Sequence, residues 1–250
     1  FLDPACGCGN FLVIAYRELR ALELEVLTRQ FATQQSVLAH VQDHVLVDVD
    51  QFHGIEIEEF PAQIAQVAMW LMDHQMNLRV SEQFGENVVR LPLKKSATIV
   101  HGNALRIDWN EVVPAERLHY ILGNPPFAGK HYQTKDQRAD QAIVTADIRS
   151  GSDLDFVANW FIKAAAYTAD TRVDFAFVAT SSITQGEQVP LLWPYLLDRH
   201  GLRIHFAHRT FRWRNEARGQ AAVHCVIIGL TRSEVSESRL FEYGDPGAEP

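Results

Sequence analysis

The sequence contains few cysteines and no long apolar run, and both absences narrow the classes of protein to which it can belong. Its 250 residues include three cysteines, Cys6, Cys8 and Cys225, without a Cys-x-x-Cys pair. This odd number and spacing disfavour a disulfide framework and a structural zinc site, so we expect reduced thiols and no metal. No apolar run approaches the roughly 18 residues of a membrane span, and no basic stretch followed by an apolar one opens the chain, so we expect a cytoplasmic protein.

The overall charge is negative, but positive charge is concentrated in one segment. Apolar residues make up 47% of the chain and charged residues 22%, which is typical of a large folded domain. The net charge of −8 would by itself disfavour binding to nucleic acid. From Arg199 to Arg218, however, six arginines accompany the single acid Glu216, so this window carries +5 and the remainder −13. Aromatic residues alternate with these arginines, as expected of a surface that contacts nucleic acid.

Helix-like and strand-like segments alternate along the chain. Helical spacing of apolar residues predicts helices over 10–30, 33–47, 61–77, 153–169 and 186–199. Apolar runs predict strands at the opening residues and within 52–57, 97–105, 118–127, 173–183, 202–208 and 221–232. This order predicts an α/β fold with a mostly parallel sheet covered on both faces, and an antiparallel hairpin of the last two strands at one edge. The polar segment 128–152 lacks periodicity and is predicted to be a substrate loop.

The chain opens on "FLDPACGCGNF", as if a strand were entered at its last residues. We therefore expect a piece of a longer polypeptide. Residues 1–240 are predicted to form one catalytic domain with a truncated first strand, and residues 241–250 a tail towards a further domain.

The glycine-rich segment "DPACGCGN" lies between a predicted strand end and a predicted helix start. Gly7 and Gly9 let the backbone approach a ligand, and the helix N-terminus offers free N–H donors. Leu12 stands where a dinucleotide-binding loop would have its third glycine, which disfavours a dehydrogenase. Asp3 would repel a pyrophosphate but would pair with the ammonium group of S-adenosylmethionine.

Glu56 ends the next predicted strand. A carboxylate there has two oxygens with which to accept both hydroxyls of a cofactor ribose. The alternative is a solvated charge at the strand end, beside Glu58 and Glu59.

The segment "NPPF", residues 124–127, forms a rigid tip after the strand that ends near Leu122. An aromatic amine is a poor nucleophile because its lone pair is delocalised into the ring. The Asn124 side-chain oxygen and the Pro125 carbonyl could accept its two hydrogens and free that lone pair, while Phe127 offers a face for stacking. The alternative is a turn that only terminates a strand.

These motifs together resemble the N6-adenine DNA methyltransferases of the amino-methyltransferase class. The matching segments are "DPACGCGNF", "GIEI", "HGNAL" and "GNPPF". The resemblance implies a Rossmann-like, S-adenosylmethionine-dependent fold with a seven-stranded sheet, and a catalytic tip made of Asn124, Pro125, Pro126 and Phe127. It implies cofactor contacts at Asp3, Pro4, Ala5, Gly7, Gly9, Asn10, Phe11, Glu56, Ile57, Asn103, Ala104 and Asn124. Asn103 departs from the family's frequent Asp, and Phe127 from its commoner Tyr.

Three further segments, "GKHYQTKDQ", "SSITQGEQVPLLWP" and "FAHRTFRWRNEARGQAAVH", are similar to the methyltransferase region of MmeI-like type IIL restriction-modification polypeptides. Such polypeptides join a nuclease, a methyltransferase and a target-recognition domain in one chain. The resemblance implies double-stranded DNA as the substrate, with the nuclease before Phe1 and most of the base-reading surface after Pro250.

Basic and aromatic side chains after the tip and in the last hairpin are the candidate DNA contacts. Arginines and lysines would contact phosphates, and Phe211 or Trp213 could stack on an extruded base opposite Phe127. The complete set is Lys130, Lys135, Arg138, Phe211, Arg212, Trp213, Arg214 and Arg218. The alternative is a solvated hairpin with Trp213 packed onto the core.

Three hypotheses follow. The first is a site-specific, adenine-specific DNA methyltransferase within a restriction-modification polypeptide. The second keeps the chemistry but changes the acceptor to an RNA base or a protein glutamine amide. The third is a nucleic-acid-binding remnant without turnover.

Overall fold

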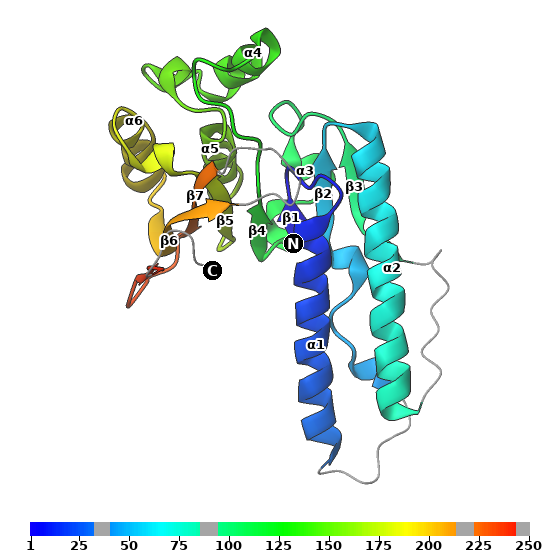
Figure 1. Cartoon of the computed structure of the whole chain (residues 1–250). Coiled ribbons are helices and arrows are strands. Elements are labelled where there is room, and N and C mark those ends of the chain that lie inside the picture. Colours follow the sequence, from blue (N-terminus) through cyan, green and yellow to red (C-terminus); the bar gives the residue numbers. More distant parts are fainter. Residues whose placement is uncertain (33–40, 86–94, 214–222, 244–250) are drawn as a thin grey trace. The chain divides into compact units, whose positions relative to one another are not determined.

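The structure is a computed structural model that describes residues 1–32, 41–85, 95–213 and 223–243. The backbone divides into two compact units, Phe1–Gly102 and Asn103–Pro250. Figure 1 labels the helices and strands of both units.

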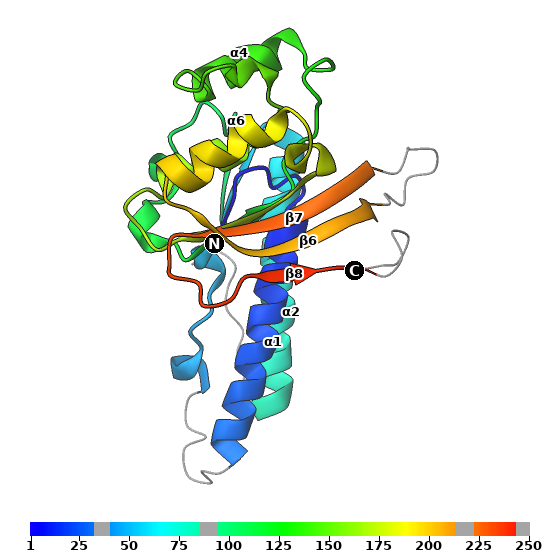
Figure 2. The same ribbon diagram turned by 90° about the vertical axis from the view of Figure 1, so that its left-hand side faces the viewer.

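The first unit is a parallel β-α-β-α-β arrangement. Its strands have the order β3-β2-β1, and each neighbouring pair is parallel. The strands are β1 (Leu2–Asp3), β2 (His53–Glu56) and β3 (Thr98–His101). The two connecting helices, α1 (Asn10–Ala32) and α2 (Glu59–Phe84), lie side by side, as both Figure 1 and Figure 2 show. Short 3-10 helices, η1 (Val41–His44) and η2 (Val49–Gln51), precede β2.

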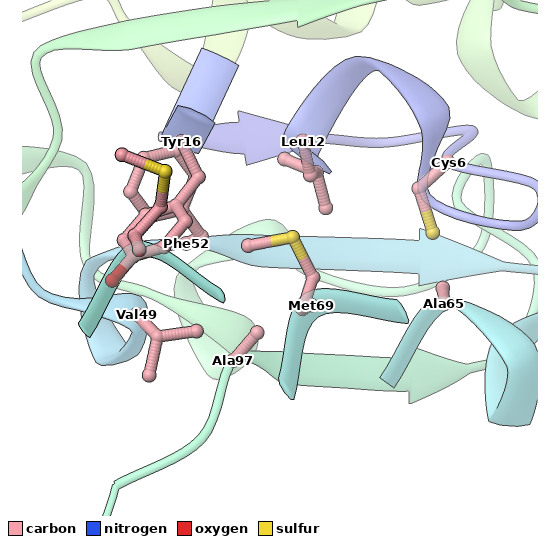
Figure 3. Close-up of a cluster of buried hydrophobic side chains, with 9 residues drawn as sticks. Cys6, Leu12, Tyr16, Val49, Phe52, Ala65, Met69 and Ala97 are labelled. Carbon is pink, nitrogen blue, oxygen red and sulfur yellow. The ribbon is translucent and has the colours of Figure 1, made fainter. Parts of the chain in front are cut away.

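Apolar side chains from the loop, the helices and the strand ends form the core of the first unit. Figure 3 shows this cluster, which comprises Cys6, Leu12, Tyr16, Val49, Phe52, Ala65, Met69, Met76 and Ala97. Two buried hydrogen bonds also join the helices. The Tyr16 hydroxyl donates to Asp73 Oδ1 over 2.6 Å, and Arg20 Nη2 donates to Asn77 Oδ1 over 3.0 Å. The polar pairs follow each other by four residues on each helix and so fix the register of α1 against α2.

The second unit contains a sheet with the order β4-β5-β7-β6-β8. β4 and β5 are parallel, β7 is antiparallel to both β5 and β6, and β8 is parallel to β6. The strands are β4 (Tyr120–Gly123), β5 (Asp174–Thr180), β6 (Arg203–Trp213), β7 (Val223–Thr231) and β8 (Arg239–Phe241). Figure 2 shows β7, β6 and β8 side by side.

Short helices connect these strands. The α-helices are α3 (Trp109–Val112), α4 (Lys135–Val144), α5 (Ala158–Tyr167) and α6 (Gln188–Pro194). The 3-10 helices are η3 (Ala115–Arg117), η4 (Gly151–Asp153) and η5 (Ser181–Thr184), and η6 (Tyr195–Arg199) continues α6 as a π-helix.

The predicted alternation of strands and helices is confirmed, and so is the antiparallel pairing of the last two long strands. The described residues contain one strand more than the seven expected, because β8 adds to the outer side of β6. The prediction of a helix over 33–47 is not confirmed in the part that can be compared. Residues 41–44 form only a 3-10 turn, and residues 33–40 lie outside the described residues.

The prediction that 128–152 is an irregular loop is wrong, because α4 lies within it. Thr134 caps this helix by accepting a hydrogen bond from the Gln137 N–H, and the Gln137 side chain accepts one from the Thr134 N–H. The Thr-x-x-Gln spacing is a capping box, which nucleates a helix without a long apolar face. The sequence contained this signal, but apolar periodicity alone does not reveal it.

Within the described ranges, no helix combines the length and the apolar character needed to cross a membrane. All three cysteines are free thiols, of which Cys6 and Cys225 are buried. In the same ranges, no cluster of three or more His, Cys, Asp or Glu residues could hold a metal ion.

Replacing Tyr16 by Phe should lower the free energy of unfolding by about 1–3 kcal/mol, because the buried Asp73 carboxylate would lose its donor. Replacing Asp73 by Asn keeps an oxygen that accepts from Tyr16 and should cost less. Urea unfolding of the two variants measures the difference. An equal loss in both would show that the hydrogen bond does not join the helices as described.

Candidate functional site

In the first unit, the candidate cofactor loop, defined as residues 3–11, turns sharply between β1 and α1. Gly7 has φ +53° and Gly9 φ +84°, both in the left-handed region that favours glycine. The Gly9 N–H donates to the Cys6 carbonyl over 2.7 Å, and the Cys6 N–H donates to the Ile55 carbonyl over 3.1 Å. A Cβ on Gly9 would lie 3.1 Å from Cα and Cβ of Ala65 on α2, whereas a Cβ on Gly7 would meet nothing within 4 Å. The loop is therefore packed against α2 at Gly9 and open at Gly7.

Glu56, at the end of β2, is held against this loop. Its Oε2 accepts from the Gly7 N–H over 2.8 Å, and its Oε1 accepts from the Glu58 N–H over 3.0 Å. Each carboxylate oxygen has a second lone pair. The Glu56 carboxylate is therefore oriented by two backbone N–H groups rather than loosely solvated at the strand end.

Asp3, at the end of β1, is almost completely buried, with 1% of its surface exposed. Its Oδ1 accepts from the Ala5 N–H over 3.0 Å. The pKa of Asp3 is raised from 3.8 to about 7, mainly by burial; the Ala5 hydrogen bond lowers this pKa and the charge of Glu56 raises it. The ionised form is therefore unfavourable without a nearby cation.

These features fit the methionine and ribose moieties of S-adenosylmethionine. An ammonium group would offset the charge of Asp3, and Glu56 retains lone pairs for ribose hydroxyls. The open space at Gly7 and the start of α1 at Asn10 are suited to a carboxylate. Among the other predicted contacts of this unit, Asn10 and Ile57 are exposed, Ala5 and Phe11 are partly exposed, and Pro4 is buried.

In the second unit, the tip of residues 124–127 follows β4 directly. Pro125 is buried, Pro126 is exposed, and Asn124 and Phe127 are partly buried. The Asn124 Oδ1 atom is inaccessible to solvent and has no hydrogen-bond partner among the described residues. An amide oxygen in this position is costly to the fold, by about 1–3 kcal/mol, unless a ligand donates to it. The tip thus contains an unsatisfied acceptor, which a ligand could reach only if the atoms that cover it move.

Asp155, which the sequence analysis did not identify, helps to fix the backbone after the tip. The Ala128 carbonyl accepts from the Phe156 N–H over 2.9 Å, and Asp155 Oδ1 accepts from the Lys130 N–H over 3.2 Å. Asp155 Oδ2 accepts from the Ser182 hydroxyl on η5. Asp155 therefore joins the segment behind the tip to the end of β5, a role that no local pattern predicts because its partners lie 25 and 27 residues away.

Asn103 uses its side chain within the protein. Its Oδ1 accepts from the Leu105 N–H over 2.9 Å, and its Nδ2 donates to Asp140 Oδ2 over 2.7 Å. Asp140, buried on α4, also accepts from Arg106 Nε over 2.6 Å. Ala104 is buried, and its carbonyl accepts from Trp109 Nε1 over 2.9 Å. Asn103 and Ala104 thus build the turn, and Asp140 fixes the orientation of the Asn103 amide.

The candidate phosphate contacts after the tip differ in whether acidic side chains already pair with them. Lys130 Nζ lies 3.2 Å from Glu187 and 3.6 Å from Asp153, and these acids raise its pKa. Lys135 and Arg138 are exposed. Lys130 and Arg138 both line a cavity of about 420 Å³ with His131. Lys130 would have to exchange its acids for a phosphate, whereas Lys135 and Arg138 have no ion pair to break among the described residues.

In the hairpin, the structure does not support Phe211 as a stacking face. Only 2% of its surface is exposed, and its ring packs edge-on against Tyr243 at 6.1 Å. Arg212 is exposed on β6, and Trp213 ends that strand. Arg214 and Arg218 lie outside the described residues.

Comparison with known proteins gives a consistent result. A family model described as "MmeI, DNA-methyltransferase domain" matches residues 1–242. The chain is 40% identical over 234 residues to DNA methyltransferase A of Bacillus subtilis (strain 168), covering 92% of this chain and 26% of that protein.

Solved structures with a similar fold include restriction-modification enzymes and a methyltransferase. The type IIL restriction-modification enzyme MmeI, solved in complex with DNA, is 55% identical, with a TM-score of 0.93 over 100% of this chain and 33% of that chain. A putative class I S-adenosylmethionine-dependent methyltransferase from Listeria monocytogenes has a TM-score of 0.54 at 12% identity, covering 98% of this chain and 58% of that chain, and shows the fold alone. The predicted fold class is therefore confirmed. The chain spans 26% and 33% of the length of its two more similar relatives.

Replacing Gly9 by Ala should destabilise the protein by about 2–4 kcal/mol, because the new Cβ combines a left-handed backbone with a tight approach to Ala65. Replacing Gly7 by Ala adds the backbone strain alone and should cost about 1 kcal/mol. Thermal unfolding compares the variants. A larger loss for Gly7→Ala would contradict the packing described.

Replacing Asp3 by Asn should stabilise the ligand-free protein at high pH. The pKa of Asp3 is higher in the folded state than its ordinary 3.8, so the folded form holds the proton and stability falls as the pH rises from about 4 to about 7. Asn keeps an oxygen for the Ala5 N–H and carries no charge. Its advantage should reach a few kcal/mol above pH 7, shrink as the pH falls from about 7 to about 4, and disappear below that. Urea unfolding of both proteins across this range measures it, and a pH-independent difference would refute the assigned ionisation.

Proposed function

Because the chain belongs to the family of MmeI DNA-methyltransferase domains, we propose that it transfers the methyl group of S-adenosylmethionine to N6 of an adenine flipped out of duplex DNA. One observation carries the proposal for the acceptor. The Asn124 Oδ1 atom stands at the end of β4, buried and without a donor among the described residues. An exocyclic amino group supplies the missing donor.

On the acceptor side, the tip would bind and activate the amino group. Asn124 Oδ1 accepts one hydrogen of the amine, and the Pro125 carbonyl accepts the other. Two fixed acceptors favour a pyramidal nitrogen whose lone pair points away from the ring, so no general base is needed to start the attack. Phe127 stacks on the base plane and holds it in position. The rigidity of Pro125 and Pro126 keeps both acceptors in place.

On the donor side, residues of the candidate cofactor loop would hold S-adenosylmethionine, which supplies an electrophilic methyl group on a sulfonium. Asp3 pairs with the ammonium group, and Glu56 accepts from the ribose hydroxyls. Asn103 retains the second hydrogen of its amide nitrogen and the second lone pair of Oδ1 for the cofactor adenine, because one of each is engaged within the turn. We assign it a minor share of the binding.

The DNA substrate belongs to the same proposal. MmeI, which is 55% identical, was solved in complex with DNA. Lys135, Arg138 and Arg212 are the exposed cations that would contact phosphates. Since the relatives are three to four times longer, we place this domain in a type IIL restriction-modification polypeptide that carries a nuclease and a target-recognition domain. Chromosomal DNA as the substrate would set its place of action in the cytoplasm.

Replacing Asn124 by Ala should reduce methyl transfer by at least about 100-fold, because it removes an acceptor aimed at the reacting amine. Affinity for S-adenosylmethionine should stay within a few-fold, since the two charged cofactor contacts, Asp3 and Glu56, lie in the first unit and are unchanged. Tritiated methyl uptake measures the first quantity and calorimetric titration the second. Loss of both together would contradict the role assigned to Asn124.

Acceptor specificity is tested with the full-length polypeptide on four substrates. These are duplex DNA, the same duplex with purine in place of the target adenine, RNA and a glutamine-containing protein. The proposal expects uptake on the first alone. Uptake on RNA or protein would favour another planar nitrogen as the acceptor, and cofactor binding without transfer to any of them would indicate a non-catalytic remnant.

A further inference from the structure

Helix α2 exposes a row of large apolar side chains on one face. Phe60 is 72% exposed, Val67 54% and Leu71 45%. Together with Ile64, His74 and Leu78 they follow each other at alternating distances of four and three residues. We call the set Phe60, Ile64, Val67, Leu71, His74 and Leu78 the α2 seam. Its spacing is that of the contact positions of a coiled coil, and it extends for about 27 Å along the helix.

The α2 seam contains no Asp, Glu, Lys or Arg, and neither do the exposed positions beside it between Phe60 and Leu78. Between Phe60 and Leu78 the exposed positions outside the seam are occupied by glutamines. The single ionisable acid in this stretch, Asp73, is buried and bonded to Tyr16. A solvated helix face normally alternates apolar with charged residues. Five turns without an exposed charge are instead typical of a surface covered by another apolar element.

The opposite face of α2 is already buried. Ala62, Ala65, Met69, Met76 and Val80 point into the first unit. The helix is therefore apolar on two sides, and helices that are hydrophobic all round are normally buried all round. The core of the unit accounts for one side and leaves the seam unexplained.

Helix α1, which lies beside α2 (Figure 1), provides the contrast. Its Val26 is 54% exposed, the same fraction as Val67. Around Val26, however, Glu18, Glu25 and Arg29 keep the surface charged and exposed. Scattered apolar residues of this kind are ordinary on a protein surface.

The chemistry of the seam selects among possible partners. Nucleic acid is disfavoured because Glu58 and Glu59 precede the seam and the first cation after it is Arg79. A membrane surface is disfavoured because a helix lying on lipid headgroups carries Lys and Arg along its polar face. Heptad spacing with uncharged flanks suits a second helix packed lengthwise.

We propose that the α2 seam is the docking face for a helix of the same polypeptide that lies outside these 250 residues. The relatives with 40% and 55% identity are three to four times longer than the part that matches, so long segments are available to supply it. The proposal does not depend on the methyl-transfer chemistry. In this proposal, α2 forms the interface between the domain and another part of the same polypeptide.

The test uses the full-length polypeptide with the photo-crosslinking residue benzoylphenylalanine at position 67. Irradiation followed by protease digestion and mass spectrometry identifies the partner peptide. The expected result is an intramolecular crosslink to a segment outside residues 1–250. The matched control carries the same residue at position 26, where that crosslink should be lost.

Three outcomes would overturn the proposal: a crosslink from position 67 to a second copy of the chain, a crosslink to DNA, or equal yields at positions 67 and 26. Benzoylphenylalanine is large and could itself disturb the packing of α2, so a second pair of variants tests the docking face without it. Val67→Glu should lower the melting temperature of the full-length protein, because it buries an unpaired charge, while Val26→Glu should leave it almost unchanged. Equal melting temperatures in this pair would also contradict the docking face.

Discussion

An amide oxygen is buried at the end of β4 without a donor among the described residues, and the proposed chemistry depends on it. Such an atom costs stability, so the surrounding structure must compensate. Two prolines fix the backbone on one side, and the bonds of Phe156 and Asp155 fix the segment behind it. In the proposed reaction, this fixed backbone would hold the Asn124 oxygen in position, so that substrate binding would require less ordering of the tip.

In the candidate cofactor loop, too, the proposed function would explain a local cost in stability. Burial makes the Asp3 carboxylate unfavourable as an anion, and Glu56 adds repulsion. A cationic ligand group would remove much of that penalty, so part of the instability of the free protein becomes affinity for the ligand. The exposed seam on α2 is a third surface whose composition suits an absent partner. The Asn124 oxygen, the Asp3 carboxylate and the α2 seam are each unfavourable for the stability of the free domain. Each would become favourable if a ligand or partner bound there.

The sequence predicted those parts of the protein whose causes are local. A few neighbouring residues are enough to predict the glycine-rich turn of the candidate cofactor loop, the strand end at Glu56 and the turn at Asn124. Helix α4 was missed because its signal is the capping pair Thr134 and Gln137 rather than an apolar face. Asp140 and Asp155 were also missed, since their partners are distant in sequence and become neighbours only after folding. Phe211 illustrates the opposite error, because an aromatic residue among arginines can be a core residue.

The position of the Asn124 amide relative to a bound substrate tests the account most directly. A crystal structure of the full-length polypeptide with duplex DNA and a non-reactive analogue of S-adenosylmethionine would measure it. The account predicts an extruded adenine whose N6 lies within about 3 Å of Asn124 Oδ1. An adenine bound with its amino group turned away from Asn124, or an Asn124 oxygen still without a donor in that complex, would contradict it.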